Sequence, residues 1–207
     1  MKLLKITSGL AFLALTACVE PPAPKLLSVY GAKTPTEHDT LYHTIGNFEL
    51  INQNGEKVSK ATVANKIYVA NFFFATCQSI CPEMSSNLSR VQQEFANDDS
   101  LLILSHSVNP LHDTVEVLKS YAAQYKAIDG KWHLLTGNKK VIYDLAKNDY
   151  LVNALEDDGT PEGFLHSELF LLIDTKGRIR GMYDGTNKAD VEKLIHDIKL
   201  LKTEKAS

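Results

Sequence analysis

The chain has 207 residues, 44% of them hydrophobic, and a formal net charge of −3 at pH 7. This length suits one domain with a substantial core and is too short for two comfortable ones. The charge is small and mixed in sign along the chain, so no basic face is available to neutralise phosphates, and nucleic acid is not expected as a partner.

The first eighteen residues have the form of an export signal. Two lysines precede an apolar run, Ile6 to Ala17, that is shorter than the ~20 residues a membrane-spanning helix needs. The run ends in Leu15-Thr16-Ala17-Cys18, which resembles the bacterial lipobox, where the cysteine is lipidated. The alternative is an ordinary signal with a chance cysteine, but Cys18 lies where cleavage is expected. We therefore expect an exported, periplasm-facing lipoprotein whose lipid holds it in the inner or the outer membrane.

The next segment is proline-rich. Val19-Glu20-Pro21-Pro22-Ala23-Pro24 has the composition of a spacer, so residues 19–40 are predicted to be a flexible tether and residues 41–207 the folded domain. The chain has three cysteines, and lipidation of Cys18 leaves Cys77 and Cys81 as the only pair in an oxidising compartment.

From about residue 44 onward the sequence alternates between strand and helix patterns. Strands are predicted at Phe48–Asn52, Glu56–Val58, Ile67–Phe74, Leu101–Val108, Trp132–Leu135, Glu168–Asp174 and Arg178–Tyr183. Helices are predicted from Pro82 to Phe95, from a Thr114 cap to Tyr125, from an Asn138 cap to about Lys147, and from Asp190 to Leu201. Buried strands joined by helices and followed by a late hairpin predict an α/β, thioredoxin-like fold with a central mixed β-sheet flanked by helices.

Cys77 and Cys81 lie between a buried strand and the helix that begins near Pro82. If this segment is helical, residues four apart face the same way and both sulfurs meet one partner. A helix N-terminus favours thiolate, which is the nucleophile of disulfide exchange and a soft ligand for copper(I). The other interpretation is a structural disulfide or two inert thiols, but structural bridges usually close longer loops.

The spacing of the pair narrows the chemistry. Thioredoxin-type oxidoreductases have two residues between their cysteines, whereas three separate Cys77 from Cys81. A metal bound by two thiolates usually needs a third ligand. His166 is the candidate, because the loop before the late strand faces the cysteine pair in a thioredoxin-like fold. An S₂N set suits copper(I) or copper(II).

Three segments together resemble the Sco/SenC family of copper chaperones over roughly residues 40–200. They are Phe72–Pro82, Ser105–Thr114 and the run from His166 to Asp174. The resemblance implies copper ligation by Cys77, Cys81 and His166. It also implies delivery of copper to the copper A centre in subunit II of cytochrome c oxidase, or to another cuproprotein, or reduction of that centre's cysteines.

The chain departs from the family at one position of the second segment. Asn109 stands where the family usually has aspartate, which removes a negative charge but no ligand. Nearby, Asp113 is expected to help cap the following helix. We expect a monomer that is not primarily an enzyme.

Two rival functions share the fold. A thiol–disulfide oxidoreductase acting on a cuproprotein needs only the two cysteines, and one protein can combine this activity with copper binding because copper binds reduced thiolates. A peroxiredoxin needs a Pro-x-x-x-Thr/Ser-x-x-Cys run, and the residues before Cys77 contain no proline. The sequence therefore leaves the first two functions open and disfavours the third.

Overall fold

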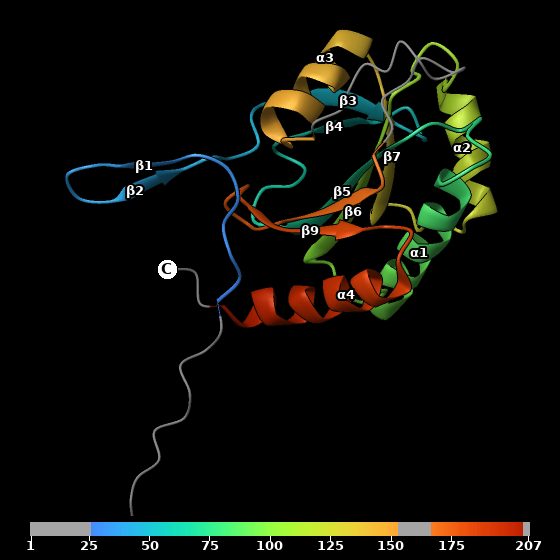
Figure 1. Ribbon diagram of the computed structural model, residues 1–207. Coiled ribbons are helices and arrows are strands. Elements are labelled where there is room, and N and C mark those ends of the chain that lie inside the picture. Colours follow the sequence, from blue (N-terminus) through green and yellow to red (C-terminus); the bar gives the residue numbers. More distant parts are fainter. Residues whose placement is uncertain (1–25, 153–166, 205–207) are drawn as a thin grey trace, which may run out of the picture.

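The computed structural model describes residues 26–152 and 167–204, which contain a seven-stranded sheet with helices packed on both faces (Figure 1). The strand order is β4-β3-β7-β6-β5-β8-β9. The strands are β3 (Glu49–Asn52), β4 (Lys57–Ser59), β5 (Ile67–Phe73), β6 (Leu101–Ser107), β7 (Trp132–Thr136), β8 (Leu169–Ile173) and β9 (Ile179–Asp184). Strands β5, β6 and β7 are parallel, and the outer strands pair antiparallel. The predicted mixed sheet and late hairpin are confirmed.

The centre of the sheet is buried on both faces. Every residue of β5 and of β6 is buried, which agrees with their nearly continuous apolar sequences. One polar exception in β6, Ser105, has partners on both neighbouring strands: its hydroxyl donates to Asn71 Oδ1 at 2.6 Å and accepts from Trp132 Nε1 at 2.9 Å. These bonds satisfy polar groups that are costly to bury unpaired.

His106 in β6 is fully buried. Its ring stacks on Phe72 at 5.0 Å between centroids and lies 5.3 Å from the Tyr150 ring. Nδ1 lies 3.2 Å from the carbonyl oxygen of Asn71, so it carries the proton, and Nε2 has no hydrogen-bond partner among the described residues. Burial lowers the pKa of His106 to about 4, and this effect outweighs the hydrogen bonds with the backbone of Asn71 and Leu104, which raise the pKa. The ring is therefore neutral at physiological pH.

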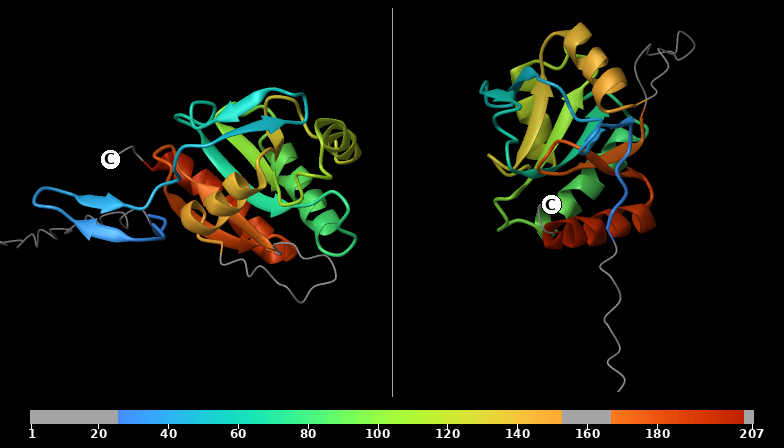
Figure 2. Two further views of the ribbon diagram at one scale, coloured as in Figure 1. Left: turned by 90° about the horizontal axis from the view of Figure 1, so that it is seen from above. Right: turned by 90° about the vertical axis from the view of Figure 1, so that its left-hand side faces the viewer.

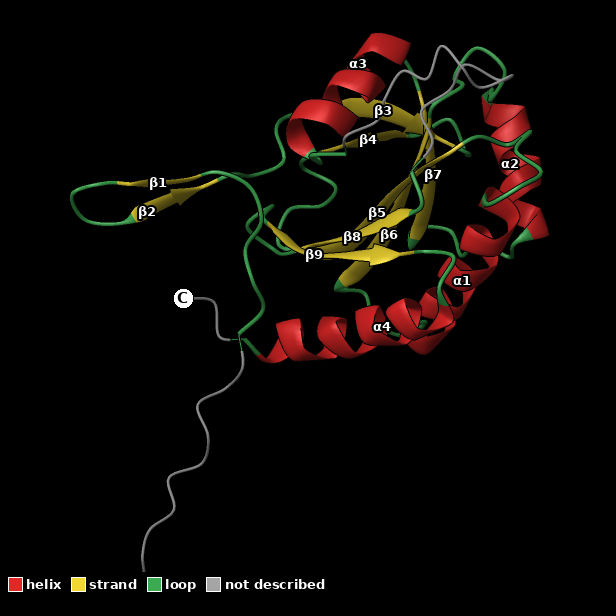
Figure 3. Ribbon diagram, viewed as in Figure 1, coloured by secondary structure: helices red, strands yellow, loops and turns green. Residues whose placement is uncertain are grey.

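Four helices follow the strands in the chain order expected. They are α1 (Cys81–Glu94), α2 (Val115–Gln124), α3 (Lys139–Asp144) and α4 (Lys188–Thr203). Helix α1 lies between α2 and α4: the Ser85 and Tyr121 hydroxyls are 2.8 Å apart, and Arg90 pairs with Glu192. Helix α3 covers the opposite face of the sheet from α4 (Figures 1 and 3).

The predicted caps are confirmed, and one helix ends differently from its prediction. Thr114 and Asn138 accept hydrogen bonds from the third residue of their helices. The third helix was predicted to run to about Lys147, but its α-helical part ends at Asp144 and a π-helical turn, η1 (Leu145–Asp149), follows. The wider turn brings Tyr150 into the core, where its hydroxyl donates to that of Tyr68 at 3.3 Å.

A small hairpin projects from the domain. It consists of β1 (Lys33–Pro35) and β2 (Thr40–Tyr42), which pair only with each other, and Figure 2 shows it standing away from the main sheet. This hairpin lies largely in the range predicted as tether. Two-stranded hairpins are marginal alone, and this one is fixed at its base, where the Arg178 guanidinium lies 5.5 Å from the centre of the Tyr42 ring.

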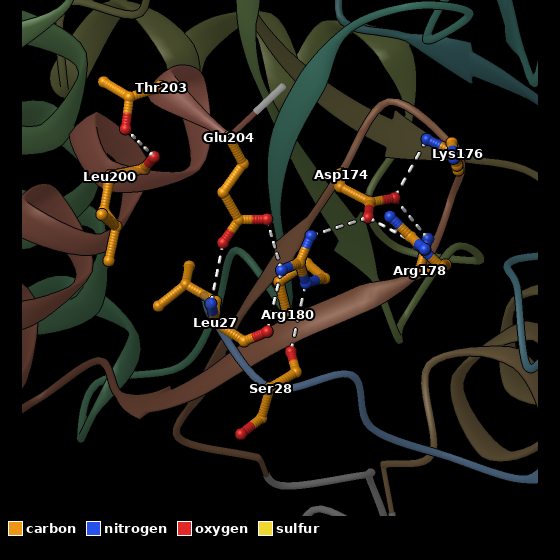
Figure 4. A network of polar contacts seen from close by, with 9 residues as sticks. All are labelled: Leu27, Ser28, Asp174, Lys176, Arg178, Arg180, Leu200, Thr203 and Glu204. Carbon is orange, nitrogen blue, oxygen red and sulfur yellow. Dashed lines mark hydrogen bonds and ion pairs between the residues drawn. The ribbon is translucent and has the colours of Figure 1, made fainter. Parts of the chain in front are cut away.

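A buried ion network holds the chain before the hairpin against the domain (Figure 4). Arg180 of β9 donates to the carbonyl oxygens of Leu27 at 2.8 Å and Ser28 at 3.1 Å. The same guanidinium pairs with Asp174 at 3.2 Å and Glu204 at 2.6 Å. The domain boundaries stay predictions, but these contacts show that the chain from Leu27 onward already packs on the domain.

The helices within residues 26–152 and 167–204 are all too short or too polar to cross a membrane.

Candidate functional site

The cysteine loop joins the C-terminal end of β5 to the N-terminal end of α1. The chain turns directly after the strand, where the Cys77 amide donates to the carbonyl oxygen of Phe74 at 3.2 Å. Cys81 is the first residue of α1 and is followed by Pro82, a residue favoured at that position because it has no N–H to leave unpaired. Cys77 therefore lies outside the helix, and the predicted helical spacing is not what aligns the two cysteines. The loop itself aligns them.

The two thiols are free, buried and in contact with each other. Their residues are 5% and 3% exposed. An interaction between the two side chains helps to lower the pKa of Cys77 and to raise that of Cys81. The Ser79 hydroxyl lies 3.4 Å from the sulfur of Cys77. Because both sulfurs lie together at one helix N-terminus, they can act on the same partner.

The two thiols differ in acidity. Burial opposes ionisation of Cys77, but hydrogen bonds from the Ser79 hydroxyl and from the backbone N–H groups of Cys81 and Ser79 outweigh it and lower its pKa. Burial raises the pKa of Cys81 to about 12, and the nearby Cys77 and Asp113 raise it further. A hydrogen bond with the backbone of Phe74 lowers this pKa, but by less than the other effects raise it. The prediction that the helix N-terminus favours thiolate therefore holds for Cys77 and is wrong for Cys81, where burial dominates.

Asp113 lies behind the cysteine loop, in the segment between β6 and α2. The sequence predicted that it helps to cap α2, and this is wrong: Thr114 is the cap, and its side chain accepts from the Val117 amide at 3.4 Å. The buried Asp113 carboxylate instead accepts from the Ala75 amide, 38 positions earlier in the chain. Ser79 and Asp113 are the neighbours of the thiols that sequence reasoning missed. Ser79 was visible inside the cysteine motif, whereas nothing local marks the long-range contact of Asp113.

The structure tests only part of the predicted ligand set. His166 and the predicted lipidation site Cys18 lie outside the described residues, so their roles stay predictions. Within the ranges described, no group of three or more His, Cys, Asp or Glu side chains is placed to hold a metal ion. Two adjacent free thiols nevertheless fit copper, because thiolate sulfur is the soft donor that copper(I) prefers.

The fold and this pair define a thioredoxin-like protein with a dithiol at the junction of a central strand and a helix. The chain belongs to the SCO1/SenC family, whose sequence profile matches residues 36–203. The SCO1 protein homolog of Bacillus subtilis is 28% identical over 206 residues, covering 98% of this chain and 99% of the relative.

Solved structures of Sco proteins share the fold. A SCO1/SenC family lipoprotein from Bacillus anthracis str. Ames superposes with a TM-score of 0.70 at 28% identity, over 77% of this chain and 95% of that one. BsSco superposes with a TM-score of 0.68 at 28% identity, over 79% of this chain and 95% of that one. It is described as a member of the Sco family of cytochrome c oxidase assembly proteins that has a disulfide switch. Copper-bound ScoI from Bradyrhizobium japonicum superposes with a TM-score of 0.61 at 25% identity, over 76% of this chain and 99% of that one.

Proposed function

We propose that this protein is a membrane-anchored copper chaperone that binds copper through Cys77, Cys81 and His166. Its recipient is the copper A centre in subunit II of cytochrome c oxidase or another cuproprotein. The observation that carries the proposal is the pair of free, buried, mutually contacting thiols in a chain of the SCO1/SenC family. The relatives support it, since one Sco protein was solved with copper bound and another is described as an oxidase assembly protein.

Copper is the cargo in this proposal. The two thiolates supply soft donors, and the His166 imidazole supplies a nitrogen that is acceptable to copper(I) and copper(II) alike. Binding requires the reduced pair, because oxidation to a disulfide removes both thiolates from the donor set. The redox state of Cys77 and Cys81 therefore controls loading.

We propose that a lipid on Cys18 anchors the protein to the membrane facing the periplasm, and that it works as a monomer. The lipoprotein from Bacillus anthracis supports the anchor. Replacing Cys18 by Ala should release the protein into the soluble periplasmic fraction or leave it unprocessed, because the acyl chains are the proposed anchor. Correctly cleaved Cys18→Ala protein that still sediments with membranes would contradict the anchor.

The second candidate is a thiol–disulfide oxidoreductase that reduces cysteines of the recipient. The different acidities of the two thiols favour it, since a pair of this kind has an attacking thiol, Cys77, and a resolving thiol, Cys81. Disulfide exchange does not need an imidazole, so the contribution of His166 separates the two functions.

Copper titration of the reduced protein lacking residues 1–18 tests the proposal. We expect one copper per chain, with two sulfur neighbours and one nitrogen neighbour by X-ray absorption. His166→Ala should weaken binding severely while leaving reversible oxidation of the cysteines intact, and His196→Ala, on the exposed face of α4, is the control. Only oxygen and nitrogen neighbours would refute copper binding at the thiols. Normal oxidase activity of a His166→Ala strain at low copper would favour the oxidoreductase.

A further inference from the structure

The side chain of Asp113 is completely buried at the end of the sheet that carries the cysteine loop. Its Oδ2 accepts hydrogen bonds from the Ala75 amide at 3.1 Å and from the Ser107 hydroxyl at 2.5 Å. Its Oδ1 lies 3.0 Å from Nδ1 of His112, whose side chain is half exposed. The carboxylate thus connects the loop that follows β5, the last residue of β6 and the loop that follows β6.

These contacts reach the backbone that leads into the cysteines. Ala75 lies two residues before Cys77, in the turn that directs the chain from β5 toward α1. Ser107 is the last residue of β6 and lies opposite Phe73, the last residue of β5. Asp113 therefore holds the first turn of the cysteine loop against the end of the neighbouring strand.

A buried carboxylate is costly unless its charge is compensated. The donors to Asp113 are a backbone amide, a hydroxyl and a half-exposed imidazole, so no lysine or arginine of residues 26–152 and 167–204 is among its hydrogen-bond partners. Its negative charge acts on Cys81 through space. Such a charge close to two sulfur ligands favours a bound cation. A positioned carboxylate is a common hydrogen-bond partner of metal ligands.

We propose that Asp113 is a positioning residue for the metal site, which holds the Ala75 amide so that Cys77 and Cys81 present both sulfurs to one copper ion. This inference rests on the proposed copper-binding function. Asp113 itself is not a ligand here, since its oxygens are used by the two loops. It acts mainly through the conformation of the cysteine loop, and its charge contributes the smaller part.

Two substitutions separate these contributions. In Asp113→Asn, the amide oxygen can take the place of Oδ2 and keep both of its bonds, while the amide nitrogen donates to Nδ1 of His112 in its other tautomer. This variant loses the charge and keeps the connections. In Asp113→Ala, all three connections are lost.

The measurement is copper affinity by chelator competition, together with the sulfur-to-copper(II) charge-transfer absorption. We expect Asp113→Ala to weaken copper binding by about 10–100-fold and to change the absorption band, as removal of supporting groups at metal sites does. Asp113→Asn should keep most of the copper affinity that Asp113→Ala loses. A purely structural role would lower stability and leave the band unchanged.

Asp197 provides the matched control. It is also a buried carboxylate, but on α4, where it accepts from the Tyr183 hydroxyl at 2.9 Å and pairs with Lys193 at 2.6 Å. Asp197→Ala should lower stability without changing copper affinity or the band. If Asp113→Ala does not fold, Ser107→Ala removes one donor to the same carboxylate and should give a smaller change of the same kind.

The inference is overturned if Asp113→Ala binds copper with the same affinity and absorption band as Asp197→Ala. It is also overturned if Asp113→Asn loses as much copper affinity as Asp113→Ala. A wild-type protein without sulfur-bound copper would refute the proposed function instead. The equilibrium between the dithiol and disulfide of Cys77 and Cys81 in glutathione buffers then still tests positioning. We expect Asp113→Ala to shift this equilibrium at least several-fold, and no shift relative to Asp197→Ala would overturn the inference.

Discussion

Strand β5 has a buried acidic group near each of its ends, and the two are satisfied in opposite ways. Near its first residue, Asp174 and Glu204 both pair with the guanidinium of Arg180. Beyond its last residue, the Asp113 carboxylate has an amide, a hydroxyl and a half-exposed imidazole as its hydrogen-bond partners in the described part of the chain. The first cluster is a compensated ion network, and the second keeps a negative charge beside two thiols.

This difference separates a structural role from a site role. The Arg180 network joins the N-terminal segment, β9 and the end of α4, so its charges serve to hold chain segments together (Figure 4). Asp113 lies at a similar depth, but the described residues give its carboxylate no lysine or arginine partner. Its charge is therefore available to the neighbouring cysteines. Substitutions at the two ends should therefore have different readouts.

Arg180→Met should have the largest effect on stability. It removes the partner that two carboxylates share, and these side chains are only 4% and 12% exposed. Asp174 keeps its ion pair with Arg178 at 2.7 Å, so the loss falls mainly on Glu204 and on the N-terminal segment. Breaking a buried pair in this way costs about 3–5 kcal/mol. Urea unfolding of the reduced, copper-free protein measures the loss, and the copper absorption band of the folded fraction should stay unchanged.

Arg90→Met is the control for this prediction. Arg90 also pairs with a glutamate, Glu192, but the two side chains are 42% and 62% exposed. Exposed pairs contribute about 0–1 kcal/mol. Equal losses from Arg180→Met and Arg90→Met would show that the buried network does not hold the N-terminal segment as argued.

His106 gives a pH-dependent effect in the core between the two ends. Its pKa is about 4 in the folded protein and 6.5 in an exposed imidazole. Between these two pH values the imidazole is protonated in the unfolded chain and neutral in the native state. The free energy of unfolding therefore decreases as the pH falls from about 6.5 to 4, by about 3 kcal/mol in total. His106→Phe keeps a ring against Phe72 and should remove this part of the pH dependence.

The measurement is the difference in unfolding free energy between His106→Phe and wild type at pH 7.5, 5.5 and 4.5. Taking the difference cancels the titration of the other groups. The unfolding free energy of His106→Phe should increase relative to that of the wild type as the pH falls. A difference that stays constant with pH would contradict a neutral imidazole at this position in the core.

The smallest effect concerns the thiols themselves. At pH 7.5 iodoacetamide should modify Cys77 at least about 100-fold faster than Cys81, because thiolate is the reactive form and the pKa of Cys81 is about 12. Ser79→Ala removes a donor to Cys77, raises its pKa and should slow its alkylation several-fold. Ser86→Ala, on the exposed side of α1, should change nothing. Peptide mapping measures both sites, and equal modification of the two cysteines would contradict the assignment of roles.

The sequence determined the elements and the identity of the reactive pair. Apolar runs mark β5 and β6, and polar caps mark the starts of α2 and α3, because these signals depend on residues a few positions apart. The cysteine motif was legible for the same reason. The π-helical turn at Leu145–Asp149 was not, since it depends on how Tyr150 packs in the core.

Only the tertiary structure decided what the buried charges do. Asp113 and the amide it holds are 38 positions apart, and Arg180 and the carbonyl of Ser28 are 152 apart. A local pattern cannot choose between partners at such separations, because the choice depends on which chain segments the sheet brings to the same edge. The same holds for the acidity of Cys81: its place at a helix start predicted a thiolate, and its burial, which is a property of the whole fold, made it a thiol.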